Sequence, residues 1–390
     1  MTTATHSHLG ASGAERWMHC PGSVALVQRF GKHEDDGDGP DYRWQGTVAH
    51  AAIADCLEHG FEAWEVVGKE YEGHTLTAAL SEGAAFYLSV VLPHLADPRT
   101  SLVMVEEKLS APDIHPALFG TTDLGFVTGN TLRIFDYKNG AGVSVDVQEN
   151  PQEMYYAFLT LIRLEKAHPE VYKQITAVEL TIVQPNDFNP AGKVRTWLTT
   201  AAHIEDWGFN VLVKAMCEAD KGQPTLDVGA HCRFCPAKII CPAQQLLFAQ
   251  LASANPADAK QMTDAELSRY YELLEPAAMF IKAVKDETYS RLMNGAELTT
   301  AKLVKSQADR VWKDGALQRF STLYGTAAFT DPKLKSPAQM EALPQAGPLV
   351  REFAYTPDTG LTVKPMSAKG LAIKPPKKTS LLTQVDGSVR

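Results

Sequence analysis

The fold class follows from residues 119–138, F-G-T-T-D-L-G-F-V-T-G-N-T-L-R-I-F-D-Y-K. Two runs rich in β-branched and aromatic residues flank Gly129-Asn130, a dipeptide typical of a tight hairpin turn. A further strand is predicted just upstream, in S-L-V-M-V-E-E-K-L at 101–109. The stretch therefore predicts a three-strand antiparallel meander.

Helical and extended patterns surround the meander on both sides. Pro151 opens a predicted helix, where proline in the first turn is well tolerated. The other predicted helices are 12–30, 45–59, 77–95 and 203–220, and the other predicted strands are 175–184 and 194–200. This order predicts an α/β fold with a mixed central sheet flanked by helices.

The chain is long enough for one large domain and an appendage. It has 390 residues, of which 45% are hydrophobic, so it can bury a substantial core. We expect a main domain at 1–250, a helical and mixed accessory module at 251–330 with a helical hairpin at 262–294, and a flexible tail rich in proline and lysine at 331–390.

Membrane and secretory classes are not expected. No apolar run of eighteen residues is evident, and the N-terminal segment lacks a basic region followed by an apolar one. We therefore expect a cytoplasmic protein with no membrane partner. The net charge of −9 argues against a protein coated in nucleic acid but leaves room for a local basic groove.

The meander also carries the chemistry. Asp136 and Lys138 are two apart in a strand, so their side chains share one face. If the hairpin forms, Asp123 lies close to Asp136. Two carboxylates beside a lysine are typical of a site that holds Mg²⁺ or Mn²⁺ next to a phosphate. A single Asp-x-Lys at a strand end is more often a surface ion pair, so the pattern gains weight only as a set.

Four other residues can join that set. His50 shares a helix face with apolar residues, where a histidine is more often a satisfied core residue than a ligand. Gln152 and Tyr156 are one helical turn apart, so both can face one phosphate or base. Glu106, on the first strand, is equally a metal ligand or a solvated carboxylate.

Four of the six cysteines form a second constellation. Cys232, Cys235 and Cys241 have C-x₂-C-x₅-C spacing, and Cys20 lies far upstream in M-H-C-P-G-S. Four thiolates suit structural zinc, whereas cysteine–proline steps also occur in iron–sulfur runs, so spacing leaves both open. If Cys20 completes the set, the metal site joins the two ends of the long segment between Cys20 and Cys232. Cys56 and Cys217 are expected to be buried small hydrophobes.

Taken together, these motifs resemble a known family. G-T-x-x-H, G-T-T-D, D-Y-K and Q-x-x-x-Y, bracketed by one early and three late cysteines, resemble RecB-like PD-(D/E)XK nucleases. The similarity is to the iron–sulfur group that includes CRISPR-associated and AddB-type nucleases. More narrowly, A-E-R-W-M-H-C-P-G-S and V-W-K-D-G resemble an uncharacterised phage and prophage family.

The resemblance implies a restriction-endonuclease-like core with a helical iron–sulfur periphery. It implies metal ligands at His50, Asp123 and Asp136, a catalytic Lys138, DNA-binding Gln152 and Tyr156, and a first-strand Glu106. The four cysteines would carry a [4Fe–4S] cluster. Asp136 stands where many members have glutamate, so the carboxylate is one methylene shorter.

The implied activity is Mg²⁺- or Mn²⁺-dependent exonuclease action on DNA ends in phage recombination, with a phage single-strand annealing protein as a partner class. A non-cleaving DNA-binding scaffold and a zinc-stapled regulator are the alternatives. Further DNA contacts are expected from scattered residues, namely Arg16, Lys193, Arg195, Arg233, Lys238 and Trp312.

Overall fold

The computed structural model describes residues 7–30, 43–140, 143–221, 224–252 and 262–293, with residues 296, 298, 299 and 301. The chain divides into two compact units, Met1–Leu303 and Val304–Arg390. The second unit lies outside the described residues, and so do the expected 331–390 tail, most of the mixed module and Trp312. The first unit contains every described helix and strand.

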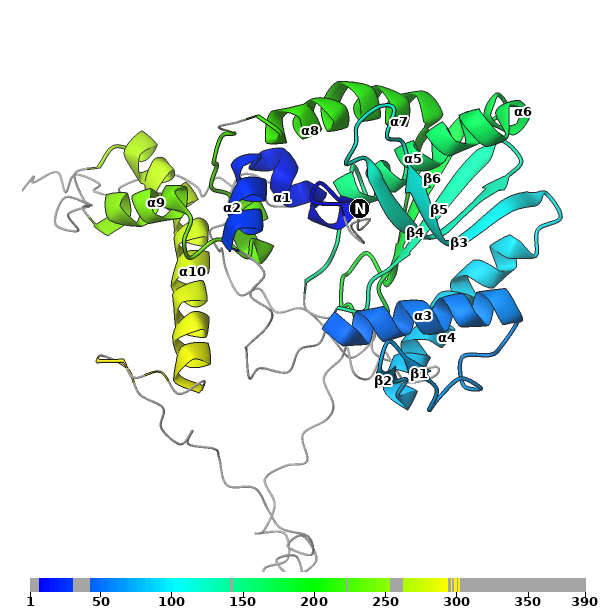
Figure 1. The fold of residues 1–390 in the computed structure, drawn as a ribbon, viewed down its shortest axis with the longest axis horizontal. Helices are drawn as coiled ribbons and strands as arrows, with labels where there is room; N and C mark the ends of the chain where they lie inside the picture. The colour runs from blue at the N-terminus through cyan, green and yellow to red at the C-terminus, as the bar shows by residue number, and fades with distance from the viewer. Residues whose placement is uncertain are drawn as a thin grey trace, which may run out of the picture. The chain divides into compact units, whose positions relative to one another are not determined.

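The described part is mixed α/β (Figure 1). Its helices are η1 (Ala11–Gly13), α1 (Ala14–His19), α2 (Gly22–Phe30), α3 (Arg43–His59), α4 (Ala78–Leu95), α5 (Pro151–Ala167), α6 (Pro169–Tyr172), α7 (Ala201–Trp207), η2 (Gly208–Leu212), α8 (Val213–Ala219), η3 (Ala230–Phe234), α9 (Pro242–Ala252) and α10 (Asp264–Met293). Its strands are β1 (Glu70–Tyr71), β2 (His74–Thr75), β3 (Thr100–Ser110), β4 (Phe119–Thr128), β5 (Thr131–Tyr137), β6 (Ala177–Val183) and β7 (Val194–Thr200).

The larger of the two described sheets has the order β3-β4-β5-β6-β7. All neighbours are antiparallel except β5 and β6, which run parallel and are linked through α5. A parallel pair needs a crossover connection, and α5 is that crossover. The carboxyl ends of β5 and β6 therefore lie at the same edge of the sheet.

The hairpin between β4 and β5 forms as the sequence predicts. Thr128 pairs with Thr131, and Gly129 between them has φ +60°, a conformation that glycine adopts without steric cost. Every expected strand of the meander and both later strands are present. The expected mixed sheet flanked by helices is confirmed.

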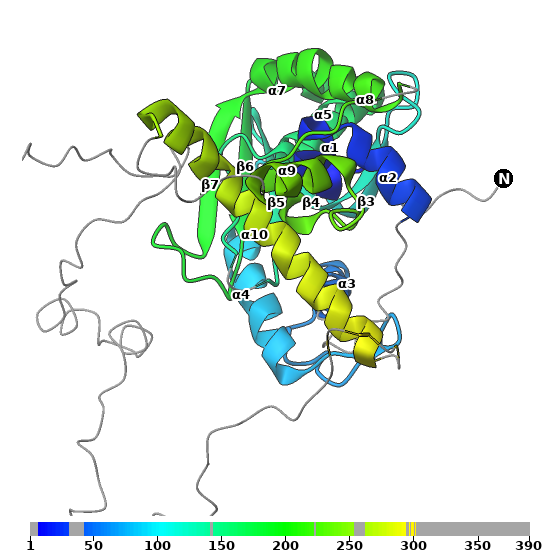
Figure 2. The same cartoon turned by 90° about the vertical axis from the view of Figure 1, so that its left-hand side faces the viewer.

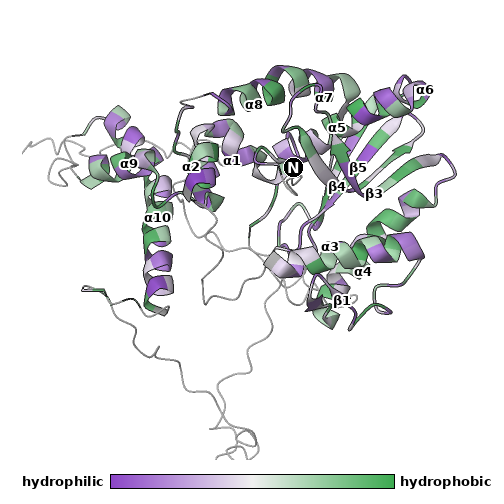
Figure 3. Ribbon diagram, in the orientation of Figure 1, coloured by the Kyte–Doolittle hydropathy of each residue, from purple (hydrophilic) through white to green (hydrophobic). Residues whose placement is uncertain are grey.

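Two hydrophobic cores cover the two faces of the sheet. Helices α3 and α4 pack on one face around Tyr87, Phe126 and Phe135. Helices α1, α5 and α8 pack on the other around Trp17 and Phe158. Figures 1 and 2 show the sheet between these helix layers from two directions. On α7 and α8, hydrophobic and hydrophilic residues alternate along the helices, as expected where one face meets the core (Figure 3).

Two glycines allow unusually close packing. A Cβ on Gly83 of α4 would lie 2.5 Å from the hydroxyl oxygen of Tyr137, the central residue of D-Y-K. A Cβ on Gly208 would lie 2.2 Å from the ring of Phe158. Gly208 begins the π-helical turn η2 that joins α7 to α8, so the predicted 203–220 helix contains a local irregularity there.

Three sequence predictions need correction. The expected helical hairpin at 262–294 is a single helix, α10, which continues through Pro276. The expected helix at 12–30 is interrupted at Cys20, whose φ of −132° and ψ of 78° are not helical. Cys217 is exposed rather than buried, whereas Cys56 is buried as expected.

Within the described residues, α4 alone is long and apolar enough to cross a membrane by length and composition. Its residues Leu80, Ala84, Tyr87, Leu88 and Val91 are buried in the core that α4 shares with α3 and the sheet. A core helix satisfies the same length and composition criteria, and these contacts are those of a core helix.

Candidate active site and cysteine pocket

Strand register brings three carboxylates to one edge of the sheet. The pairs Val105–Leu124 and Glu107–Thr122 flank Glu106 and so set it opposite Asp123. The pair Leu124–Phe135 sets Asp123 next to the position of Asp136. The predicted proximity of Asp123 and Asp136 thus arises from hairpin register, as the turn signal indicated.

His50 on α3 reaches the same edge from the helix layer. Its Nδ1 lies 3.3 Å from Asp123 Oδ2 and 3.6 Å from Glu106 Oε1. Among the described residues, His50, Glu106 and Asp123 are the one group of three His, Cys, Asp or Glu residues whose ligand atoms lie within 4.8 Å of one another. The His50 and Glu106 side chains are 31% and 34% exposed, so this group is open to solvent.

A second group lies at the end of β5. Lys138 Nζ is 2.8 Å from Asp136 Oδ2 and donates to Gln152 Oε1 at 3.0 Å. Gln152 Nε2 in turn donates to Asp136 Oδ1 at 3.1 Å. Asn150 caps α5 by accepting from the backbone N–H of Gln152, which fixes the start of the helix beside the strand. Lysine, aspartate and glutamine therefore form a closed triangle of contacts.

The two groups are linked through the backbone between them. The N–H of Tyr137 donates to Asp123 Oδ2 at 2.8 Å, and the Tyr137 ring meets the His50 ring edge-on, with centroids 5.5 Å apart. Tyr156, also expected at this site, is only 9% exposed. Burial and the nearby Asp136 and Asp123 carboxylates raise its pKa well above the usual range, so its hydroxyl stays protonated.

In the absence of a cation, the pKa values of three groups at this edge are raised, so these groups keep their protons. Burial by itself would lower the pKa of His50, but Asp123 and Glu106 outweigh it and raise that pKa to about 9. Burial also raises the pKa of Asp123 in spite of His50. Burial would lower the pKa of Lys138 as well, but Asp136 raises it, so the lysine stays charged. A bound cation would take over the role of these protons.

Glu106 is held in a strained conformation. Its φ of +44° lies in the left-handed region, which costs a residue with a Cβ about 1–3 kcal/mol. Such strain persists where the surrounding structure enforces it, and here the flanking strand pairs do so.

One residue of the site was not among the sequence predictions. Glu153 is fully buried, and its carboxyl group lies within hydrogen-bonding reach of Asp136. Burial first, and the Asp136 charge second, raise its pKa well above the usual range. The signal was present, because Glu153 shares the apolar face of α5 with Ala157, Thr160 and Leu164. A carboxylate on a core-facing position is rare and was readable as such.

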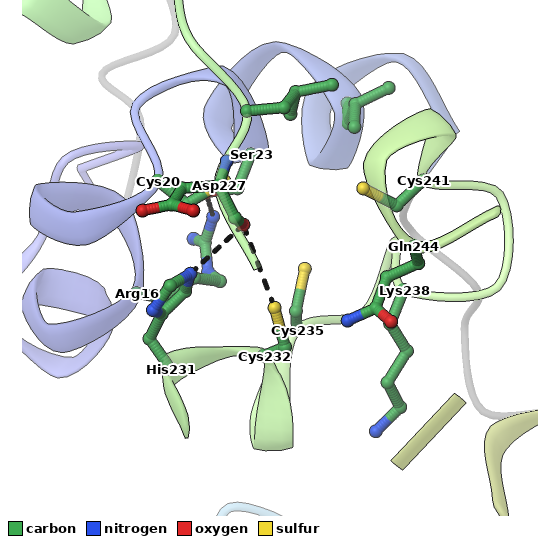
Figure 4. A pocket seen from close by; sticks show the side chains of 12 residues that line it. Arg16, Cys20, Ser23, Asp227, His231, Cys232, Cys235, Lys238, Cys241 and Gln244 are labelled. Atoms are coloured by element: carbon green, nitrogen blue, oxygen red, sulfur yellow. Dashed lines mark hydrogen bonds between the residues drawn. The ribbon is translucent and has the colours of Figure 1, made fainter. Parts of the chain in front are cut away.

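The four predicted cysteines line one pocket (Figure 4). Cys20 comes from the break between α1 and α2, Cys232 from η3, and Cys235 and Cys241 from the segment before α9. The backbone holds the early and late segments together, since the N–H of Gly22 donates to Thr225 O at 2.7 Å. The sulfur atoms of Cys232, Cys235 and Cys241 point into the pocket in Figure 4. Cys20 thus lies in the same pocket as the late cysteines, and closure of the chain through a shared metal site stays a prediction.

The sulfur atoms do not converge on one point. No three of these four thiols lie mutually within 4.8 Å, the spacing that the His50 group satisfies among the described residues. Burial by itself would raise the pKa of Cys20 and Cys232, but hydrogen bonds from His231 outweigh it and lower both. Burial raises the pKa of Cys235 and Cys241. Arg16 and Lys238 also line the pocket and add positive charge.

One of the expected DNA contacts is ruled out by burial. Arg195 is 6% exposed, and its guanidinium donates to Asp187, Gln184 and two backbone carbonyls. That prediction is wrong, because a strand residue at this position faces a polar interior. Lys193 and Arg233 are exposed.

Comparison with known families places this chain in one of them. A single family model, described as "Protein of unknown function (DUF2800)", matches residues 6–385, nearly the whole chain. The chain belongs to the DUF2800 family. That membership is in keeping with the narrower resemblance to an uncharacterised family, and it assigns no activity.

Among solved structures, this DUF2800 protein is similar to one titled "Crystal structure of SSO0001". The two share 11% sequence identity, and the match covers 59% of this chain and 84% of that chain at a TM-score of 0.26. A likeness at that level carries no argument about fold or function.

Proposed function

We propose that this protein is a metal-dependent DNA nuclease with a restriction-endonuclease-like core. The observation that carries the proposal is the meeting of two groups at one sheet edge. The first is His50, Glu106 and Asp123, and the second is Lys138, Asp136 and Gln152. Either group by itself could be an ordinary surface ion pair. The hydrogen bond from Tyr137 N–H to Asp123 joins the two groups into one site, which separate surface ion pairs would not form.

The residues present fit a hard divalent cation. Carboxylates are the ligands that Mg²⁺ and Mn²⁺ prefer, and an imidazole beside them favours Mn²⁺, the softer of the two ions. The three donor atoms are already close and open to solvent. His50, Asp123 and Glu106 would hold the ion, with Asp136 adjacent. When bound, such an ion acidifies a water molecule and stabilises negative charge on a phosphate.

The protein's own residues would supply positioning and charge. Tyr137 N–H fixes the Asp123 carboxylate, and Gln152 fixes Lys138 and Asp136 relative to each other. The Lys138 ammonium, charged and held by two partners, would orient the attacking water and attract the phosphate. Glu153, neutral behind Asp136, adds no second negative charge to repel the phosphate.

Exonuclease action on DNA ends is the more specific proposal. It rests on the resemblance of the motifs to RecB-like nucleases, and it includes phage recombination or replication as the setting and the bacterial cytoplasm as the location. DNA is then the partner of the site, and a phage single-strand annealing protein is the partner class that such an exonuclease serves.

A [4Fe–4S] cluster in the cysteine pocket is the second cofactor of the proposal, and it rests on the resemblance of the motifs to iron–sulfur nucleases. Tetrahedral zinc with bonds of about 2.3 Å needs sulfur atoms about 3.8 Å apart, whereas no three of these thiols lie mutually within 4.8 Å. A cluster of several atoms is larger than one ion, so its cysteine sulfur atoms stand further apart. The positive charge of Arg16 and His231 offsets thiolate charge in either case. Zinc is the alternative, and metal analysis separates the two.

Degradation of end-labelled linear DNA by anaerobically purified protein with Mg²⁺ or Mn²⁺ tests the proposal. Wild-type protein should degrade it, and Lys138→Ala should not. Lys173→Ala is the matched control, since Lys173 pairs with Glu170 on the surface. Cleavage that survives in Lys138→Ala would place the activity elsewhere or in a contaminant.

A non-cleaving DNA-binding scaffold is the competing function. It predicts DNA binding without degradation in any divalent metal, by protein that is folded and loaded with its cluster.

A further inference from the structure

The loop between β6 and β7 presents an exposed aromatic ring. Phe188 is 89% exposed, the highest exposed fraction among the large apolar side chains of the described residues. Single exposed apolar residues are common on protein surfaces and by themselves indicate nothing. The position and anchoring of this residue distinguish it from the others.

The loop starts at the catalytic edge. Because β5 and β6 run parallel, the residues after Val183 leave the sheet beside Lys138, whose N–H donates to Val183 O at 2.9 Å. Asn186 then donates to the backbone oxygen of Asn139 at 3.0 Å. Phe188 is therefore two residues from a direct contact with the segment that follows D-Y-K.

The loop is fixed on both sides of the ring. On one side, Asp187 forms a 3.0 Å ion pair with Arg195, and both side chains are about 95% buried, with relative exposures of 6% and 5%. On the other side, Asn189 donates to the hydroxyl of Ser144. Gln184 adds bonds to Gly140 O and Val143 O at 2.8 and 3.0 Å. The segment that carries Phe188 is therefore anchored by a buried ion pair and by side-chain hydrogen bonds.

The charge around the ring suits a nucleic acid. Arg195 neutralises Asp187, so the loop adds no unpaired carboxylate near the ring, and Lys193 at its far end is exposed. A rigid, solvent-facing phenyl ring loses little freedom when a flat apolar partner covers it. Nucleobases offer such faces, and stacking on them tolerates any sequence.

We propose that Phe188 stacks on an unpaired nucleobase of the DNA and so holds the strand beside the catalytic edge. This deepens the proposed nuclease function and rests on it. Phe188 would be a substrate-contacting residue that sets affinity for single-stranded ends, while the chemistry stays with the residues of the sheet edge.

The test is binding of fluorescein-labelled single-stranded DNA by the full chain in EDTA, where no cleavage occurs. Phe188→Ala should raise the Kd between about fivefold and about a hundredfold, and Phe188→Tyr, which keeps the ring, should restore most of the affinity. Trp64→Ala, which removes another ring that is 71% exposed, should leave the Kd unchanged. Thermal unfolding of all three variants should match the wild type.

A scan of the oligonucleotide with single abasic sites adds a coupling measurement. One position should weaken wild-type binding but leave Phe188→Ala unaffected, because the two changes remove the same contact. If the wild type binds DNA and Phe188→Ala binds equally well, the stacking inference is wrong and the nuclease proposal stands. If the wild type neither binds nor cleaves DNA, both are overturned.

Discussion

The sheet edge and the cysteine pocket differ in how far the bare protein has assembled them. At the edge, the donor atoms of His50, Glu106 and Asp123 already lie within 4.8 Å of one another. In the pocket, four thiols face a common space but stand further apart. The edge is built on paired strands, whose register fixes each Cβ, whereas the cysteines sit on a helix break, a short helix and a loop.

With the proposed cofactors bound, the two sites would depend on them in different ways. Backbone hydrogen bonds preorganise the edge, so a cation there adds chemistry to a fold that exists without it. In the pocket, the bound group itself would pull the N-terminal segment and the late cysteine run together. Its binding free energy would then be part of the free energy of folding.

The largest expected effect is on catalysis at the edge. Asp123→Asn removes a proposed metal ligand, yet the amide oxygen can still accept from Tyr137 N–H. We expect cleavage to fall at least about a thousandfold, equivalent to about 4 kcal/mol, with little change in Tm. Rates on end-labelled DNA and thermal unfolding measure the two. Asp113→Asn, at an exposed ion pair, is the control. A large fall in Tm would mean that the edge is a folding element after all.

The next effect is on stability through the pocket. Cys20→Ser should lose bound iron and sulfide and lower the free energy of unfolding by more than about 4 kcal/mol, because structural metal sites contribute about 10 kcal/mol or more. Metal analysis and thermal unfolding under anaerobic conditions measure this. Cys217→Ser, at an exposed thiol, should change neither. Full metal content in Cys20→Ser would remove Cys20 from the site.

A smaller effect is the pH dependence of metal binding at the edge. The pKa of His50 is about 9, so below that pH the ion must displace a proton from it. Between pH 7 and 8, above the value of about 7 to which burial raises the pKa of Asp123, affinity for Mn²⁺ should rise up to about tenfold per pH unit. His50→Gln should flatten this slope, and His203→Gln should keep it. Calorimetric titration with Mn²⁺ gives the slopes; equal slopes in all three proteins would contradict the assignment.

The same pKa has the opposite consequence for the metal-free protein. A histidine with a raised pKa stabilises the fold below its ordinary value of 6.5, and this contribution is lost as pH rises toward 9. The Tm of the metal-free protein should therefore fall across that window. Saturating Mn²⁺ should reduce the fall, because the cation replaces the proton.

The smallest expected effect is at Glu153. Burial holds this carboxyl neutral, so glutamine should fit with a change in unfolding free energy below about 1 kcal/mol at pH 5. As pH rises above 4.5, the ordinary pKa of glutamate, Glu153 loses its proton in the unfolded wild type but keeps it in the fold. The free energy of unfolding of the wild type therefore falls, whereas that of Glu153→Gln does not change through this residue. The Tm of the variant relative to wild type should therefore increase with pH. A constant difference would mean that Glu153 is charged in the fold.

Local patterns were sufficient for much of the fold. The Gly129-Asn130 turn, the alternating strands and the proline that opens α5 each act through neighbouring residues, so β4, β5 and α5 were predictable. The helical hairpin predicted at 262–294 is wrong, because α10 runs unbroken through this range and continues past Pro276.

The sequence by itself determined which residue types stand on which strands and helices, and so the candidate roles of Asp136, Lys138 and Gln152. Only the tertiary structure decided that Glu106 belongs with His50 and Asp123, that Arg195 is buried, and that Glu153 lies buried beside Asp136. The physical reason is distance along the chain. Periodicity records which face a residue takes within its own element, whereas burial and ligand geometry depend on strands and helices that pack from elsewhere in the sequence.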